Sequence, residues 1–341
     1  MARVATAPDS ATHLPAEVSS FVGRRTDRAE VRRLLAESRL VTLTGFGGIG
    51  KTRLATHVAA ELRRAYPDGV WMVPLGDLSD PAELADEIAV GLGIRSQSRR
   101  PAVTMLVEHL AARELLLVLD NCEHLIDACA ALVDGLLRAC PRLRILVTSR
   151  SVLRIGGESV LTLAPLSWPA QDVAASVPLH QFESVRLFLD RAQQVVPDFA
   201  VDDDNRAAIL QICRHLEGIP LAIELAAARV RILSPSALLA RLDQRLALLT
   251  GGARDLPERQ QTLRATIAWS HDLLVPPERV LFARLAVFAG GCTFETAEAV
   301  CNAAGGIQID LFDGLDSLVQ KNLVRQAEGP GGDPRFTMLE T

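Results

Sequence analysis

One stretch of eight residues constrains the fold of this 341-residue chain more than any other feature. It fits the pattern G-x-x-x-x-G-K-[ST] and consists of Gly45, Phe46, Gly47, Gly48, Ile49, Gly50, Lys51 and Thr52. An apolar run at residues 39–44 (RLVTLT) precedes it and a helical pattern over residues 51–64 follows it, which is the setting that a phosphate-binding loop requires. In such a loop the backbone N–H groups and the helix N-terminus surround phosphate oxygens. We therefore expect Lys51 to reach the β and γ phosphates and the Thr52 hydroxyl to bind Mg²⁺.

The alternative interpretation is a glycine-rich turn that has a solvated lysine. Lysine is rare in this chain, because Lys51 and Lys321 are the only two among 36 basic residues. That one of them falls at the required position of the motif favours the phosphate-binding loop.

Further apolar runs predict the rest of a sheet. They lie at residues 69–75, 115–119 and 143–148, with a weaker run at 159–163. Unbroken apolar runs are typical of strands that are buried on both faces, and the helical patterns between them indicate parallel crossovers. The predicted fold class is therefore α/β, a P-loop NTPase parallel sheet flanked by helices.

The second half of the chain predicts a different architecture. We expect a disordered leader at residues 1–19, a nucleotide-binding domain at 20–165 and an all-helical subdomain at 179–250. Residues 255–341 follow the breakers near Gly251 and Pro257 and read as four helices followed by two strand-like pieces. Helices followed by a hairpin predict a winged-helix domain.

Polar residues follow two of the predicted strands. Asp120 ends the run at 115–119 and is the expected metal partner, with a helix cap as the alternative. Its neighbour Asn121 cannot act as a base, so Glu123 is the nearest carboxylate for positioning water, or else it serves the start of the next helix. Arg150 follows the run at 143–148, where it can contact a γ-phosphate unless it is simply solvated.

Composition excludes several classes of protein. The net charge of −5 (36 basic and 41 acidic residues) gives no overall positive field for nucleic acid or anionic lipid. The six cysteines form no CxxC pair, which favours reduced, mostly buried thiols in a cytoplasmic protein. No apolar stretch approaches 18 residues and the N-terminus has no secretory signal, so we expect no membrane partner.

Beyond the phosphate-binding loop, several motifs spread over most of residues 20–341 carry a family resemblance. They are FVGR at 21–24, TGFGGIGKTRLA at 44–55, LLLVLDNCEHL at 115–125, ILVTSR at 145–150 and EGIPLA at 217–222. Together they resemble the STAND class of P-loop NTPases, and within it the NB-ARC-like domains of bacterial LuxR-type and SARP-type transcriptional regulators.

The resemblance implies further residues that contact a nucleotide. Val22 and Arg24 correspond to adenine and ribose contacts, and Arg53 belongs to the phosphate-loop motif. Pro220 matches a GxP motif whose ring presses on the base or sugar, although a proline at the first position of a helix also has a purely structural use. Leu221 would add an apolar contact in the same pocket.

The resemblance also implies a closing contact from the C-terminal domain. Relatives carry a Met-His-Asp motif whose His contacts the ADP β-phosphate, and the matching stretch here is Met338-Leu339-Glu340. Leu339 replaces the His, and His271 is a weak substitute. Since the family continues into helical repeats, we expect this chain to be a fragment that lacks its sensor region.

The function implied is an ATP/ADP-binding molecular switch with at most slow ATP hydrolysis. Its expected partners are the nucleotide with Mg²⁺, the missing sensor and repeat region, and a second copy when ATP is bound. One alternative is a turnover ATPase in which Glu123 positions water. Another is a DNA-binding protein acting through the winged helix, but residues 262–341 hold too few basic residues for this. DNA would then be an indirect partner, and ATP over GTP is implied by the resemblance alone.

Overall fold

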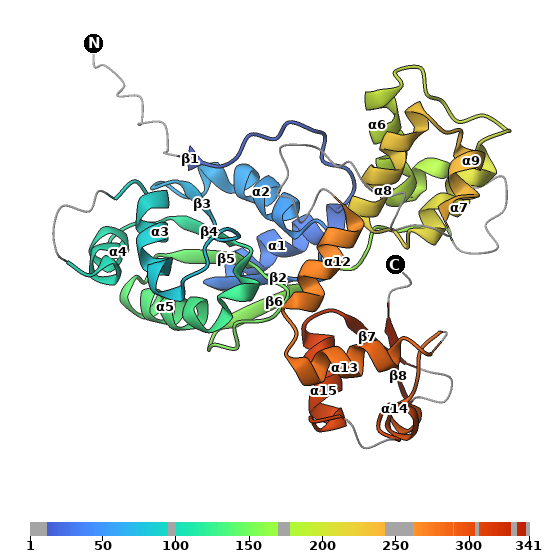
Figure 1. Cartoon of the computed structure of the whole chain (residues 1–341). Helices are drawn as coiled ribbons and strands as arrows, with labels where there is room; N and C mark the ends of the chain where they lie inside the picture. The colour runs from blue at the N-terminus through green and yellow to red at the C-terminus, as the bar shows by residue number, and fades with distance from the viewer. Residues whose placement is uncertain are drawn as a thin grey trace, which may run out of the picture. The chain divides into compact units, whose positions relative to one another are not determined.

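The computed structural model describes residues 12–94, 100–169, 178–242, 262–288, 290–303, 307–328 and 333–338 (Figure 1). Its contacts divide the chain into two units. The sheet unit comprises Met1–Thr44 and Lys51–Leu163, and the helical unit comprises Ala164–Thr341 together with the loop Gly45–Gly50. The loop therefore belongs by its contacts to the helical unit, although the strand before it and the helix after it belong to the sheet unit.

The sheet unit contains a parallel sheet of six strands in the order β1-β3-β4-β5-β2-β6. The strands are β1 (Thr12–His13), β2 (Leu40–Thr44), β3 (Val70–Pro74), β4 (Leu116–Asp120), β5 (Arg144–Thr148) and β6 (Glu158–Thr162). Every neighbouring pair is parallel. Each of the five predicted apolar runs is a strand, which confirms the predicted fold class. Because all strands point the same way, the glycine loop after β2 leaves the same edge as Asp120 and Thr148, which end β4 and β5.

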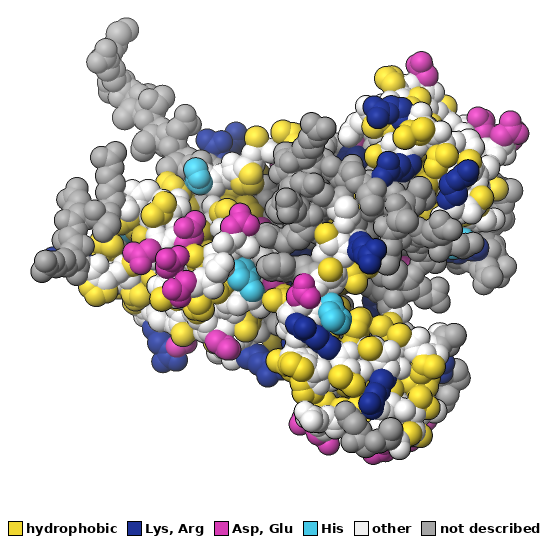
Figure 2. Space-filling view, in the orientation of Figure 1, with side chains coloured by type: hydrophobic (Ala, Val, Ile, Leu, Met, Phe, Trp, Pro, Cys, Tyr) yellow, Lys and Arg dark blue, Asp and Glu magenta, His cyan; other side chains and the backbone are white. Residues whose placement is uncertain are grey.

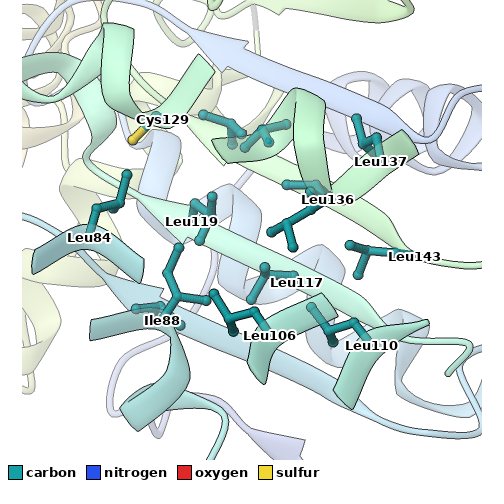
Figure 3. Packing of buried hydrophobic residues seen from close by; sticks show 14 of the residues in the cluster. Leu84, Ile88, Leu106, Leu110, Leu117, Leu119, Cys129, Leu136, Leu137 and Leu143 are labelled. Atoms are coloured by element: carbon teal, nitrogen blue, oxygen red, sulfur yellow. The ribbon is translucent and has the colours of Figure 1, made fainter. Parts of the chain in front are cut away.

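Helices cover both faces of this sheet (Figure 1). They are α1 (Arg25–Glu37), α2 (Lys51–Glu61), α3 (Leu84–Gly91), α4 (Ala102–Leu110) and α5 (Ile126–Ala139). Leu117 and Leu119 of β4 pack with Ile88, Leu106 and Leu136 of α3, α4 and α5 in one fully enclosed cluster (Figure 3). Side chains alternate along a strand, so Leu116 and Val118 point to the opposite face, where α2 contacts the sheet. Burial on both faces explains why the strands read as unbroken apolar runs.

Apart from the loop Gly45–Gly50, the helical unit begins at Ala164. Its first helices are α6 (Glu183–Val195), α7 (Arg206–His215), α8 (Pro220–Ala227) and α9 (Pro235–Leu239). Residues 243–261, which include the predicted boundary near Gly251, lie outside the described residues.

The C-terminal part of this unit has the predicted order of elements. It contains α12 (Leu263–Asp272), α13 (Pro276–Leu285), α14 (Phe294–Cys301) and α15 (Leu311–Gln320), followed by the antiparallel pair β7 (Val324–Glu328) and β8 (Pro334–Met338). A cluster of buried side chains joins the elements from α13 to β8, among them Leu281, Leu315 and Val324. Its assignment as a winged helix remains a prediction.

All six cysteines are free and buried, as the sequence predicts. Within the described part of the chain, no helix combines the length and apolar character needed to cross a membrane.

The second lysine of the chain has a structural partner. Lys321 Nζ lies 2.6 and 2.5 Å from the two carboxylate oxygens of Glu278, which is buried. The Val275 N–H donates to the same carboxylate at 2.9 Å, and the Ser317 hydroxyl also donates to it. Burial opposes ionisation of Glu278, but the bonds from Lys321, Ser317 and Val275 outweigh it and hold the pKa of Glu278 below its usual value.

Replacing Lys321 with Met is expected to destabilise the C-terminal bundle by about 3 kcal/mol, since it leaves a buried carboxylate without its cation. Because Glu278 has a lowered pKa in the folded chain, the stability it contributes is present above the unfolded pKa and is lost as the pH falls. Hydrogen exchange of the α13 and α15 amides at pH 7 and pH 4 measures both effects. Lys321→Arg keeps the charge and is the control. Unchanged protection in the Met variant would mean that the ion pair contributes nothing.

Candidate functional site

The glycine-rich loop has the backbone that a phosphate cradle needs. Gly48 and Gly50 adopt φ angles of 79° and 95°, in the left-handed region that favours glycine. Ile49 between them is fully buried and anchors the loop. The loop leads directly into α2, whose first residues are Lys51 and Thr52. The motif thus stands between a strand and a helix N-terminus, as predicted from the sequence.

The segment EGIPLA contacts this loop directly. The Leu221 N–H donates to the Gly48 carbonyl at 3.2 Å, and a Cβ added to Gly48 would lie 2.9 Å from the Leu221 Cβ. The Pro220 ring lies 4.0 Å from the corresponding Cβ position at Gly50. Pro220 is also the first residue of α8, so it serves the helix start and the loop contact together. Two residues named from the sequence, Pro220 and Leu221, therefore meet the phosphate-binding loop.

The expected metal ligands meet at the first turn of α2. The Thr52 hydroxyl donates to Asp120 Oδ1 at 2.7 Å, and the Thr148 hydroxyl donates to the same oxygen. Burial raises the pKa of Asp120, and the two threonine bonds oppose that rise. A hydroxyl and a buried carboxylate beside a phosphate loop fit Mg²⁺, which is usually held by one or two protein oxygens, water and substrate phosphates. Thr52 and Asp120 are therefore the residues that would hold the metal.

Lys51 is partly buried, and three charged side chains influence its pKa. Burial lowers its pKa to about 8, Glu123 and Asp120 oppose this, and Arg150 adds to it. A lysine whose charge is this poorly solvated gains more from a bound anion than an exposed lysine does. That Lys51 is a phosphate ligand remains the prediction of the motif.

Arg150 and Glu123 form an ion pair in the sheet unit. Arg150 Nε donates to Glu123 Oε1 at 2.9 Å, and the side chains are 8% and 4% exposed. The second carboxylate oxygen of Glu123 is buried and has no hydrogen-bond partner among the described residues. The residue predicted to sense a phosphate thus holds the carboxylate predicted to position water. The sequence placed both residues near the phosphates but did not predict that they bind each other.

Asn121 is held in an unusual backbone conformation after Asp120. Its φ is 68°, and its N–H donates to the Thr148 hydroxyl at 3.0 Å. Thr148 therefore binds both Asp120 and the backbone of Asn121. The sequence reasoning missed Thr148, although its place as the last residue of β5 was a usable signal.

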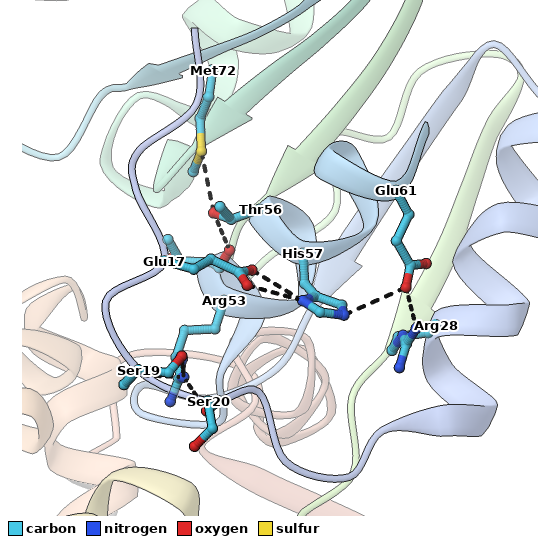
Figure 4. A network of polar contacts seen from close by, with 10 residues as sticks. Glu17, Ser19, Ser20, Arg28, Arg53, Thr56, His57, Glu61 and Met72 are labelled. Carbon is cyan, nitrogen blue, oxygen red and sulfur yellow. Dashed lines mark hydrogen bonds and ion pairs between the residues drawn. The ribbon is translucent and has the colours of Figure 1, made fainter. Parts of the chain in front are cut away.

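The residues at the N-terminal side of the site make structural contacts. Arg24 is buried in a left-handed conformation and donates to Asp27 at 2.7 Å, while Val22 is partly buried. Arg53 donates to the carbonyls of Ser19 and Ser20 and to the Ser19 hydroxyl, so it fastens the segment before FVGR to α2 (Figure 4). Nucleotide contacts by these three side chains remain predictions.

The structure describes only some of the residues that the sequence suggests for a closing contact from the C-terminal domain. Leu339 and Glu340 of the Met-Leu-Glu stretch lie outside the described residues. The side chain of His271 is 43% exposed and lies 3.9 Å from Asp272. A different residue of this region, Arg325 of β7, lies over the ring of Phe46 in the phosphate-binding loop. No local sequence pattern marks this contact, because it joins residues that are 279 positions apart.

Comparison with known proteins identifies the family. The family model described as AAA domain matches residues 33–157. Rv0894 of Mycobacterium tuberculosis, named an uncharacterized protein, is 43% identical over 88% of this chain and 72% of its own length. Rv0890c of the same organism, named as an HTH-type transcriptional regulator, is 45% identical over 91% of this chain and 34% of its own length. The regulatory protein AfsR of Streptomyces coelicolor is 32% identical over 97% of this chain and 32% of its own length.

The fold also matches a solved structure. The Walker-type ATPase PABY2304 of Pyrococcus abyssi aligns over 96% of each chain with a TM-score of 0.61 at 17% identity. The P-loop fold implies binding of a nucleotide with Mg²⁺. With the relatives and the fold in agreement, the chain belongs to the family of Rv0894 and contains a P-loop NTPase domain.

Proposed function

We propose that this chain is an ATP/ADP-binding switch module of a bacterial transcriptional regulator, which holds ADP in one arrangement and exchanges it for ATP in another. The observation that carries the proposal is the hydrogen bond from the Leu221 N–H to the Gly48 carbonyl. The loop Gly45–Gly50, which would hold the phosphates, belongs by its contacts to the same unit as Ala164–Thr341. A change in what the loop binds therefore acts directly on the helical unit.

Switching requires that the two nucleotides prefer different arrangements. A ligand that binds both arrangements equally does not change their populations. A difference of about 5.5 kcal/mol between its binding free energies for the two arrangements moves the populations from 1:99 to 99:1. Arg150 is the residue that can supply such a difference, because its guanidinium can reach for a γ-phosphate that ADP lacks. Its Nε donates to Glu123, and its Nη groups are the donors that would contact the phosphate.

The same ion pair argues for slow hydrolysis. A turnover ATPase needs a carboxylate that is ready to orient the attacking water. Asn121 is an amide, and Glu123 binds Arg150 at 2.9 Å. Fast turnover is therefore the weaker candidate.

A function as a DNA-binding module on its own has less support. On the face seen in Figure 2, the Lys and Arg side chains of the described residues around the C-terminal helices α13 to α15 lie apart from one another. Arg279 and Arg284 of α13 donate to backbone carbonyls of their own bundle, and Lys321 binds Glu278. A helix that binds a DNA groove normally presents a denser basic face.

The remaining partners follow from the relatives. Since the chain corresponds to about a third of Rv0890c and AfsR, the sensor region and the DNA-binding element of such a regulator would lie in other parts of the full protein. We propose that DNA is reached only through those parts, that self-association accompanies ATP binding, and that the protein acts in the cytoplasm.

The test is to identify the nucleotide that copurifies with the protein and to measure turnover on the same batch. Denatured protein is expected to release close to one ADP per chain, and ATP turnover is expected to be far below one per second. An empty site combined with sustained turnover would contradict the switch and support a working ATPase. In that case Glu123→Gln would be expected to stop the reaction.

A further inference from the structure

Arg325 of the C-terminal hairpin contacts the phosphate-binding loop. The guanidinium carbon of Arg325, in β7, lies 5.5 Å from the centroid of the Phe46 ring. Both residues belong to the helical unit. Phe46 is 9% exposed and is the second residue of the loop, so the arginine is held beside the start of the motif, whereas Lys51 lies at its end.

One nitrogen of the Arg325 guanidinium, Nη2, is buried and has no hydrogen-bond partner among the described residues. Burial lowers the pKa of Arg325, and the charge of Glu217 opposes that shift without cancelling it. A buried donor that makes no bond costs about 1–3 kcal/mol, and a charged donor costs more. The arrangement is therefore unfavourable unless something else binds this edge of the guanidinium.

The ring of Phe46 is a neighbour of Arg325 that offers no oxygen acceptor to this donor. A guanidinium over an aromatic face gains about 0.5–2 kcal/mol, but the ring does not replace a hydrogen-bond acceptor. Nη2 therefore still requires an oxygen partner. The planar fork of an arginine suits phosphate oxygens in particular.

Resting on the proposed nucleotide function, we propose that Arg325 is a phosphate-binding residue of this site, which donates from the C-terminal hairpin to a phosphate oxygen of the nucleotide held in the loop Gly45–Gly50. Phe46 is then a positioning residue that orients the guanidinium. Through Arg325, the hairpin would contact the bound nucleotide directly.

Arg325→Met is the decisive variant. Methionine keeps an apolar side chain against Phe46 but removes the charge and the donors. We expect the affinity for ADP, for ATP or for both to fall about 10–100-fold, which corresponds to one lost hydrogen bond to a charged group. Isothermal titration of the whole chain after removal of bound nucleotide measures this loss. Comparing the two nucleotides tells which phosphate is bound.

Two further variants distinguish a ligand contact from a structural one. Arg264 of α12 is an exposed arginine of the same unit, so Arg264→Met makes the same charge change at a solvated position and is expected to leave affinity within twofold. Arg325→Lys keeps the charge and is expected to recover part of the loss. Hydrogen exchange of β7 and β8 in the nucleotide-free protein checks that the hairpin remains folded.

The outcomes separate the inference from the proposed function. If wild-type protein binds nucleotide and Arg325→Met binds both nucleotides within twofold of it, Arg325 is no phosphate ligand and only docks the hairpin on Phe46. A wild-type chain that binds no nucleotide would instead contradict the proposed function itself. If Arg325→Met weakens binding but Arg325→Lys recovers nothing and the hairpin loses protection, the effect is structural and the inference is wrong.

Discussion

Lys51→Ala is expected to lower the affinity for ADP and ATP by more than about a hundredfold. The ammonium group is the one side-chain cation of the motif, and its loss removes charge-assisted bonds to two phosphates, each worth about 1.5–3 kcal/mol. The burial that lowers the pKa of Lys51 increases this dependence, because the empty site solvates the charge poorly. Titration with fluorescent ADP on protein freed of bound nucleotide measures the loss.

The matched control for this variant is Arg64→Ala. Arg64 is an exposed cation in the turn that follows the same helix, so its removal makes the same change in net charge away from the loop. Its affinity is expected to stay within twofold of wild type. Wild-type affinity in Lys51→Ala would mean that the glycine loop is no phosphate site.

The second large effect is expected at Arg150. Removing its guanidinium is expected to spare ADP binding and to lower the affinity for ATP about 10–100-fold, since one charge-assisted bond to the γ-phosphate is lost. The single variant Arg150→Ala would leave Glu123 buried without its cation, which is itself destabilising. The comparison is therefore best made in a Glu123→Gln background, in which no unpaired charge remains.

The Glu123→Gln variant alone provides the opposite result. It frees Arg150 from the ion pair, so the preference for ATP over ADP is expected to rise above that of wild type. Competition binding of ADP against ATP measures the nucleotide preference of Glu123→Gln and of the double variant in the same assay. Equal losses for ADP and ATP in the double variant would show that Arg150 does not distinguish the γ-phosphate.

Much of the sheet unit could be predicted from local sequence, for a physical reason. Strands buried on both faces must be apolar throughout, so residues 115–119 and 143–148 stand out without any knowledge of their neighbours. The phosphate loop is equally local, because its glycines, its lysine and its threonine all act within eight residues. Parallel strand order then brings Asp120 and Arg150 to the edge where the loop lies.

The parts that could not be predicted all depend on partners distant in sequence. Arg53 and Arg325 illustrate this: a motif suggests a role for the first that the structure does not display, and no motif marks the contact of the second. The motif suggests a ligand contact for Arg53, yet its guanidinium binds the backbone of Ser19 and Ser20. Nothing local marks Arg325, whose contact with Phe46 exists only once the chain has folded. An arginine side chain is long enough to reach many partners, so its role is decided by tertiary packing.

Polar contacts along α2 join this helix to residues that precede the recognised motifs. Arg53, His57 and Glu61 recur every fourth residue and so share one side of this helix, which begins with Lys51. Arg53 binds Ser19 and Ser20, His57 lies 3.0 Å from Glu17 and stacks on Phe21, and Glu61 binds Arg28 (Figure 4). The sequence predicts no order for residues 1–19, yet Glu17, Ser19 and Ser20 contact the helix that begins with Lys51 and Thr52. A protein trimmed to its recognisable motifs would therefore lose this support of α2, and deletion boundaries for work on this family belong upstream of Thr12, where β1 begins.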